Sequence, residues 1–294
     1  MIRFGANPIC WSNDDMPEIG AHISLEQCLN EARDIGFEGM ELGIKFPRTA
    51  EALGPILKAK GLALVSGWYS TQLLVREVGA EMLAVAGHAG LLRALGSKVL
   101  IAAETSNAIH GRRDMPLTSR PVLATSRWPE FGRRMTAFAE QVLEIYGLRV
   151  VYHHHMGTVI QSEAEIDRLM EVTGEPFHLL LDTGHATWGG GDPARIARHY
   201  RQRISHLHVK DVREEVMWRS QRQDLSFLDS VLAGVYTVPG DGIVDFDRVL
   251  AELPGYSGWI VVEAEQDTNK IDARAYAELG FANTRRMIAE AGLT

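Results

Sequence analysis

The chain has 294 residues, with 30 Lys and Arg against 38 Asp and Glu, which gives a formal net charge of −8 at pH 7. Apolar residues make up 46% and charged residues 23%, values that are typical of globular proteins and argue against disordered, collagen-like and coiled-coil classes. An acidic chain without a dense run of Lys and Arg lacks the electrostatic footprint of a nucleic-acid-binding protein. We therefore expect a small-molecule partner and no nucleic acid.

The number of cysteines and the hydropathy pattern indicate which cellular compartment to expect. Cys10 and Cys28 are too few for a disulfide framework, which favours a reducing environment. The N-terminal residues lack a signal-peptide pattern, and no window approaches 18 consecutive apolar residues. We expect a cytoplasmic protein with no membrane partner, and the sequence leaves a homo-oligomer open.

Short β-rich runs alternate with longer segments of helical period, as is typical of βαβ units around a parallel sheet. Eight strands are predicted, over residues 2–8, 39–44, 62–68, 98–103, 149–155, 177–182, 204–211 and 258–265. Eight helices are predicted, over residues 25–35, 50–60, 76–95, 127–146, 162–173, 192–200, 245–252 and 271–291.

This alternation predicts a single (β/α)₈ TIM barrel over residues 1–294. A doubly wound dinucleotide-binding fold would need a G-x-G-x-x-G turn after the first strand, and none occurs there. No linker or composition break divides the chain. The segment 212–237 is longer than a usual βα loop, so we predict an active-site lid or specificity loop there.

Polar side chains gather at the predicted carboxyl ends of strands five to eight, where TIM barrels carry their chemistry. These residues are His153, His154, His155, Asp182, His185, His206, His208, Lys210, Glu263 and Glu265. A single strand-end His is more often a hydrogen-bonded core residue than a ligand. Buried charges at four successive strand ends, however, need a shared partner, and the simplest is a divalent cation with imidazole and carboxylate ligands.

Other polar and aromatic residues near strand ends are candidates to contact substrate. They are Trp11, Glu41, Lys45, Trp68, Glu104 and His206. Trp11 and Trp68 could equally be core or rim packing, and Glu104 could be a satisfied rim carboxylate.

Five segments resemble the inosose dehydratases of bacterial inositol catabolism, within the xylose-isomerase-like barrel superfamily. They are residues 5–15 (GANPICWSNDD), 65–70 (VSGWYS), 152–158 (YHHHMGT), 181–185 (LDTGH) and 262–267 (VEAEQD). The resemblance runs nearly end to end. The first two segments are fairly specific to the dehydratases, whereas the motifs of strands six to eight are shared by the superfamily's isomerases, epimerases and endonucleases.

The resemblance implies a metal held by residues from strands five to eight. Asp182, His208 and Glu263 match three of the superfamily's ligands, and His153 stands where the epimerases carry Glu, with His155 two residues further on. That departure leaves the strand-five ligand open. The resemblance also implies Mn²⁺ or Co²⁺, and a stimulation by glutathione that no residue pattern indicates.

The function that follows is a metal-dependent hydro-lyase that dehydrates 2-keto-myo-inositol (scyllo-inosose), a polyhydroxylated cyclic ketone, to a trihydroxycyclohexane-1,2-dione. His155 or Glu265 is the candidate base, and His185 or Lys210 the candidate acid for the departing hydroxyl. A metal-dependent ketose epimerase or isomerase of the same superfamily is the alternative, and a non-catalytic sugar-binding barrel is less favoured. The net charge of −8 argues against a nuclease.

Overall fold

A closed barrel of eight parallel strands forms the centre of the computed structural model, which describes residues 1–293. The barrel order is β1-β10-β7-β6-β5-β4-β3-β2, and the first and last strands pair from Ile2 with Gly258 to Ala6 with Val262. The strands are β1 (Ile2–Ala6), β2 (Gly39–Leu42), β3 (Ala63–Thr71), β4 (Val99–Glu104), β5 (Arg149–His153), β6 (His178–Asp182), β7 (Ile204–Val209) and β10 (Gly258–Val262). The predicted (β/α)₈ barrel is confirmed.

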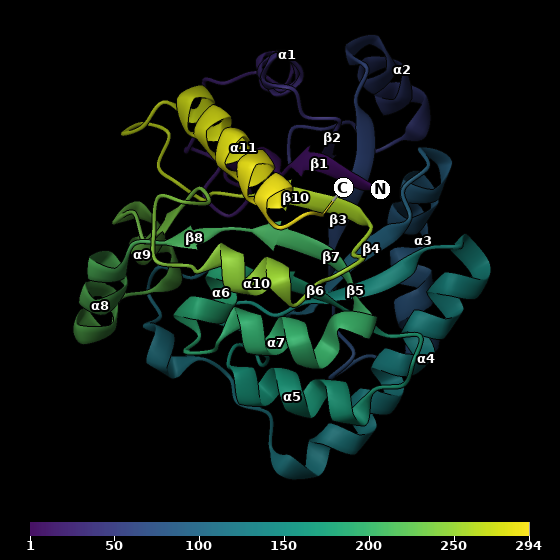
Figure 1. Cartoon of the computed structure of the whole chain (residues 1–294). Coiled ribbons are helices and arrows are strands. Elements are labelled where there is room, and N and C mark those ends of the chain that lie inside the picture. The colour runs from purple at the N-terminus through teal and green to yellow at the C-terminus, as the bar shows by residue number, and fades with distance from the viewer. Residues whose placement is uncertain (294) are drawn as a thin grey trace.

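Helices surround the barrel (Figure 1). They are α1 (Leu25–Ile35), α2 (Ala50–Lys60), α3 (Val78–Ala94), α4 (Trp128–Tyr146), α5 (Glu163–Val172), α6 (Thr183–Trp188), α7 (Pro193–Tyr200), α8 (Glu214–Gln223), α9 (Phe227–Leu232), α10 (Phe246–Ala251) and α11 (Ala273–Glu290). The first helix illustrates how the sequence sets their limits. The side chain of Ser24 accepts a hydrogen bond from the backbone of Gln27, and Gly36 ends the helix in the left-handed conformation.

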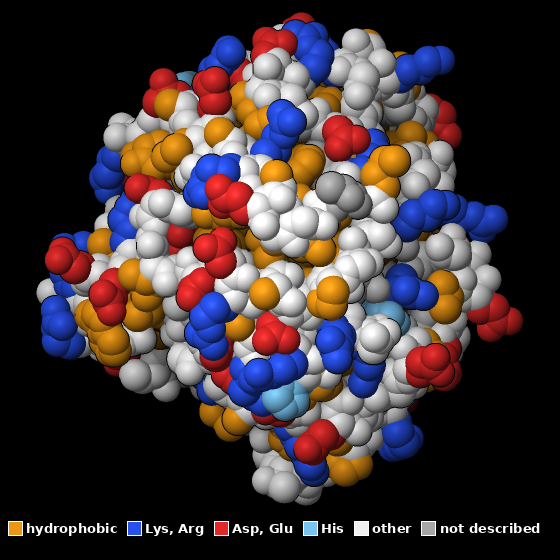
Figure 2. All heavy atoms as spheres, viewed as in Figure 1, with side chains coloured by type: hydrophobic (Ala, Val, Ile, Leu, Met, Phe, Trp, Pro, Cys, Tyr) orange, Lys and Arg blue, Asp and Glu red, His pale blue; other side chains and the backbone are white. Residues whose placement is uncertain are grey.

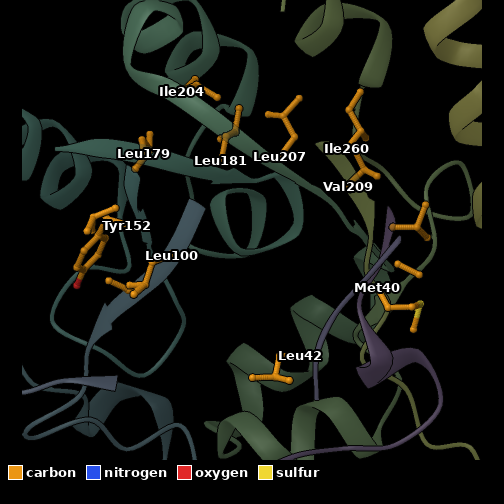
Figure 3. Packing of buried hydrophobic residues seen from close by; sticks show 14 of the residues in the cluster. Met40, Leu42, Leu100, Tyr152, Leu179, Leu181, Ile204, Leu207, Val209 and Ile260 are labelled. Atoms are coloured by element: carbon orange, nitrogen blue, oxygen red, sulfur yellow. The ribbon is translucent and has the colours of Figure 1, made fainter. Parts of the chain in front are cut away.

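The main core lies between the strands and the helices. Leu179, Leu181 and Leu207 point from neighbouring strands toward the covering helices (Figure 3). The alternate residues of the same strands point into the barrel, where Val151 and Leu180 form part of a separate apolar cluster. Burial on both faces explains why these strands read as continuous apolar runs.

Several predicted strands end earlier in the structure. The first ends at Ala6 because Asn7 caps a 3-10 helix that Pro8 begins. The fifth ends at His153 and the eighth at Val262, so His155 and Glu265 lie on the loops that follow. The seventh is divided, because Asp211 and Val212 form β8 (Asp211–Val212), which pairs with β9 (Tyr236–Thr237) outside the barrel.

The segment 212–237 is largely helical. Helices α8 and α9 lie side by side at the end of the barrel toward which β1 points (Figure 1). The turn between them passes through Asp224 at φ 48°, a left-handed conformation. We predicted a loop here, and the structure instead has these two helices.

On the face shown in Figure 2, Lys and Arg are intermixed with Asp and Glu, without a field of one sign. Among residues 1–293, none of the helices combines the length and the apolar character that crossing a bilayer requires.

Candidate metal centre and active site

Four strand-end residues converge at the carboxyl end of the barrel. Asp182 and His208 are register partners on β6 and β7. Oδ2 of Asp182 lies 3.6 Å from Nε2 of His153 and 3.7 Å from Nδ1 of His208. Nδ1 of His208 is also 2.6 Å from Oε2 of Glu263, which follows β10 directly. The structure thus brings the four predicted metal ligands together, each at most 5% exposed.

The hydrogen bonds of Asp182 indicate that this donor set fits a cation. Its Oδ1 accepts from the backbone of His185 at 2.7 Å, whereas its buried Oδ2 accepts no hydrogen bond from any residue in the described range 1–293. The Lys210 ammonium lies 3.6 Å from this oxygen and pairs with Glu263 instead, so the buried Oδ2 keeps its lone pairs available for a cation. Imidazole and carboxylate ligands suit a divalent transition metal, so the residues present fit such an ion.

His185 is a further candidate ligand that the sequence reasoning assigned a different role. Ligand atoms of His153, Asp182, His185 and Glu263 all lie within 4.8 Å of one another. Nδ1 of His185, however, accepts from the backbone N–H of Met156 at 3.1 Å and lies 2.9 Å from the Tyr236 hydroxyl, so the proton of the neutral ring is on Nε2. Nε2 therefore has no lone pair for a metal ion, and His208 fits the fourth position better.

Two backbone carbonyls orient the histidines of the strand-five end. Nδ1 of His153 is 2.7 Å from the carbonyl oxygen of His154, and Nδ1 of His155 is 2.8 Å from that of Met156. A carbonyl can only accept, so each Nδ1 carries the proton and each Nε2 keeps its lone pair. One ring is thereby prepared to bind a metal and the other to accept a proton.

Glu41 on β2 organises the opposite side of the site. Its Oε1 lies 2.8 Å from Nε2 of His206 and 3.1 Å from Nε2 of His208, and it accepts from the Ser66 hydroxyl at 2.6 Å. Asn7 donates to Oε2 of Glu41 at 2.8 Å and to Glu263 at 3.1 Å. Burial alone would raise the pKa of Glu41, but the two imidazoles hold that pKa well below its usual range.

Lys210 lies behind the carboxylates. Its ammonium group pairs with Glu263, lies 3.6 Å from Oδ2 of Asp182 and stands 4.4 Å over the ring of Tyr236. Burial alone would lower the pKa of Lys210, but Asp182 and Glu263 raise it above its usual value. Burial likewise acts to raise the pKa of Glu263, while Lys210 and His208 bring it down to about 2. The cluster is therefore ionised at neutral pH.

A cavity of about 260 Å³ opens above these residues. Seven predicted site residues line it, namely Glu41, Trp68, His153, His155, His208, Glu263 and Glu265. We assigned no role from the sequence to Asn7, Asp14, Asp15, Ser70 and His110, which also line it. Asn7 carried a usable signal, because it follows β1 directly at its carboxyl end.

Trp11, Lys45 and Glu104 do not line this cavity, which corrects their assignment to substrate binding. The Trp11 indole donates to Glu31 at 2.6 Å, and Lys45 donates to the backbone carbonyl of Gly20 at 2.6 Å. Glu104 accepts from the backbone of Leu73 at 2.7 Å. Each polar group is satisfied within the fold, so these three residues stabilise loops around the site.

Three further predicted site residues do not line the cavity. They are His206, His185 and Lys210. His206 is bonded to Glu41, which makes it a support for that carboxylate instead of a direct substrate contact. His185 and Lys210 are fully buried against Tyr236. Neither is placed to reach a hydroxyl of a molecule in the cavity, which argues against the acid role predicted for them.

His155 and Glu265 both line the cavity, and burial shifts the pKa of each. Burial lowers the pKa of His155 well below its usual value, so the ring is neutral. Burial raises the pKa of Glu265 to about 8, and Asn13 donates to its Oε1 at 2.8 Å. A neutral imidazole and a protonated carboxyl thus face one cavity.

The loop after β4 and the helix pair α8–α9 cover this end of the barrel together. Thr118 donates to Asp224 at 2.6 Å, and Arg113 donates to Asp229 at 2.6 Å. From α9, the Phe227 ring packs 4.9 Å from the ring of His155, measured between centroids. The insertion therefore contacts the site directly.

Comparison with known proteins identifies the family of the chain. The family model described as xylose isomerase-like TIM barrel matches residues 29–287. The chain belongs to this family. It is 46% identical over 293 residues to the rhizopine catabolism protein MocC of Rhizobium meliloti, covering 99% of this chain and 90% of that protein. It is 41% identical over 280 residues to inosose dehydratase 2 of Bacillus cereus, covering 94% of each.

Among solved structures, the IolI protein with a bound zinc atom superposes with a TM-score of 0.66. It is 15% identical and the match covers 98% of this chain and 99% of that one, so the likeness is one of fold. The resemblance to inosose dehydratases read from the sequence is thus confirmed at the level of the family.

Proposed function

We propose that this chain is a metal-dependent hydro-lyase that removes water from 2-keto-myo-inositol to give a trihydroxycyclohexane-1,2-dione. Its similarity to named inosose dehydratases supports a dehydratase acting in inositol-related catabolism. The observation that carries the metal dependence is the buried Oδ2 of Asp182, which accepts no hydrogen bond within residues 1–293 and faces the imidazoles of His153 and His208.

His153, Asp182, His208 and Glu263 would hold the ion. We propose Mn²⁺ or Co²⁺ from the family resemblance, and a donor set of two nitrogens and two carboxylate oxygens is compatible with either. A divalent ion there supplies a Lewis acid that polarises the ketone and stabilises the negative charge developing on its oxygen. Two carboxylates and two neutral imidazoles leave the site close to neutral when it is loaded.

His155 is the proposed base. Its Nε2 keeps a lone pair because Nδ1 donates to the carbonyl of Met156, and the ring lines the cavity. The base removes the proton on the carbon next to the ketone, and the electron pair of that C–H bond moves into the enediolate.

Glu265 is the proposed acid for the second half of the reaction. The barrel order β10-β7-β6-β5 separates the loop of Glu265 from that of His155 by two intervening strands, so the two groups approach the cavity from different sides. A proton from Glu265 converts the departing β-hydroxyl to water as the C–O bond breaks. We prefer Glu265 to His185 and Lys210 as the acid because neither of those two residues lines the cavity.

Purified protein supplied with 2-keto-myo-inositol and Mn²⁺ or Co²⁺ should release a dione that absorbs in the ultraviolet, and a chelator should abolish the release. His155→Gln should keep its metal and lose dehydration by about 10²-fold or more, on the order expected for a general base. Recovery of an isomerised ketose would instead identify an epimerase. Binding of the ketone without turnover in the metal-loaded protein would identify a sugar-binding barrel.

We also propose a cytoplasmic location, on the small number of cysteines, stimulation by glutathione, on the family resemblance, and a homo-oligomeric state. Activity measured with and without glutathione, and sedimentation of the purified protein, test the last two.

A further inference from the structure

A second and larger cavity lies at the opposite end of the barrel. Its volume is about 690 Å³, within the range of small-molecule sites. Residues at the amino ends of the barrel strands line it, among them Arg3 of β1, Arg149 of β5, His178 of β6 and Trp259 of β10. The metal centre is at the carboxyl ends, so the two cavities are distinct.

This cavity carries charge of one sign. Arg3, Lys98, Arg149 and Arg201 line it, and no Asp or Glu is among its lining residues within the described chain. The chain as a whole carries a net charge of −8, and the face in Figure 2 mixes both signs. A concave cationic surface on an acidic protein concentrates small anions.

Helix ends offer the competing explanation, because the negative ends of the barrel helices lie on this side. Arg93 and Arg203 serve that purpose: Arg93 donates to the carbonyl of Ile145 at 2.9 Å, and Arg203 to that of Met170 at 2.8 Å. Lys98, Arg149 and Arg201, in contrast, bond to no carbonyl or carboxylate among residues 1–293 through their side chains. Capping of helix ends therefore does not account for Lys98, Arg149 and Arg201 in the cavity.

Neighbouring groups hold two of these cations in place. The Arg3 guanidinium stacks over Trp259 at 4.0 Å from the ring centroid, and its Nε pairs with Glu38 at 3.1 Å. Arg149 reaches the hydroxyl of Ser205 at 3.4 Å, and that hydroxyl lies 2.8 Å from Nδ1 of His178. A site prepared in this way loses little side-chain entropy when an anion binds.

His178 lines the same cavity, close to the positive charge of Arg149. Burial, followed by the positive charges of Arg149 and Arg203, lowers its pKa to about 4. Part of this shift comes from Arg149, which lines the cavity beside His178.

We propose that this cavity is a binding site for the phosphoryl group of a small molecule, separate from the dehydratase site. Guanidinium groups match phosphate oxygens in geometry, and the cavity is larger than phosphate alone requires. The occupant is either free phosphate or a phosphorylated polyol, which share this chemistry.

The test is titration calorimetry of the full chain with inorganic phosphate, myo-inositol 1-phosphate and myo-inositol. We expect saturable 1:1 binding of both phosphate compounds and none of myo-inositol. Tighter binding of the ester assigns the site to an organic phosphate, and equal binding assigns it to free phosphate. Lys98→Gln/Arg149→Gln should weaken binding at least about tenfold, since each substitution removes a charge-assisted hydrogen bond to the phosphate.

The matched control is Arg33→Gln/Lys58→Gln, which removes the same two charges from helices outside the cavity. It should bind phosphate like the parent protein. Absence of binding to the parent, undiminished binding to the cavity variant, or an equal loss in the control would each overturn the proposal. Circular dichroism and the Tm of every variant separate loss of binding from loss of fold.

Discussion

The Nε2 atom of His208 lies 3.1 Å from Oε1 of Glu41, and this contact turns the opposite ring nitrogen toward Asp182 and Glu263. Hydrogen-bonded partners of this kind orient a metal-binding histidine and raise its basicity. Burial alone would lower the pKa of His208, but Glu41 and Glu263 hold it well above its usual value. Glu41 is therefore a positioning residue for the metal centre.

Glu41→Gln should lower metal affinity roughly 10- to 100-fold, as expected when such a partner is changed. Its amide retains the size of the side chain but loses the charge that faces two imidazoles. Metal titration by calorimetry measures the effect, and Glu38→Gln, an exposed carboxylate on the neighbouring loop, is the control. Unchanged affinity in Glu41→Gln would contradict the positioning role.

Asp182→Asn should lose bound metal and activity while remaining folded. The asparagine can still cap α6 through its side-chain oxygen, as Oδ1 of Asp182 does with the backbone of His185, but its charge is gone. His208→Ala should also lose metal. Elemental analysis of the purified variants decides, and full metal occupancy in both would refute the ligand assignment.

The His153 variants test the strand-five ligand. His153→Ala should weaken metal binding, whereas His153→Glu should keep metal and lose dehydration, because a third carboxylate makes the ion less electrophilic. Solvent deuterium entering recovered ketone would report residual proton exchange. Normal metal content and turnover in His153→Ala would mean that His155, or no strand-five residue, completes the site.

Stability should fall as the pH drops from about 6.5 toward 4, in part because of His178. Its pKa is about 4 in the folded protein, lowered by burial and by Arg149 and Arg203 from 6.5. Between these values the unfolded chain binds more protons, so acid favours unfolding. His178→Asn, which can still accept from Ser205, should recover at most about 2 kcal/mol of the loss between pH 7 and pH 5. Urea unfolding at both pH values measures it, and an identical loss in parent and variant would contradict the assignment.

Two helix glycines should respond to alanine in opposite ways. A Cβ at Gly132 on α4 would lie 2.2 Å from the carbonyl oxygen of Val172, so Gly132→Ala should destabilise the fold. A Cβ at Gly87 on α3 would meet nothing within 4 Å, so Gly87→Ala should stabilise it by about 0.5–1 kcal/mol. Thermal unfolding compares the two, and a shift of the same sign in both would argue against this packing.

The barrel and most of its site could be predicted from local pattern. Alternating strand and helix periods identified eight βα units, and Asp182, His208 and Glu263 could be found because each stands at or near the carboxyl end of its strand. The carboxyl ends of all strands in a closed barrel lie at one rim, regardless of the conformations of the loops. The position of a residue at the end of a strand is therefore enough to predict that it lies near the active site.

Only the tertiary structure decided which polar residues line the cavity and which form hydrogen bonds that stabilise the loops around it. Trp11 and Lys45 follow strand ends as Asn7 does, yet their partners are Glu31 and a backbone carbonyl, and the choice depends on the paths of loops. The cationic cavity had no signal in the sequence either, since Arg3, Arg149 and Arg201 are far apart along the chain and each reads as a surface charge. Pairing of β1 with β10 closes the barrel and brings such residues together, and that closure is a property of the whole chain, which no local window contains.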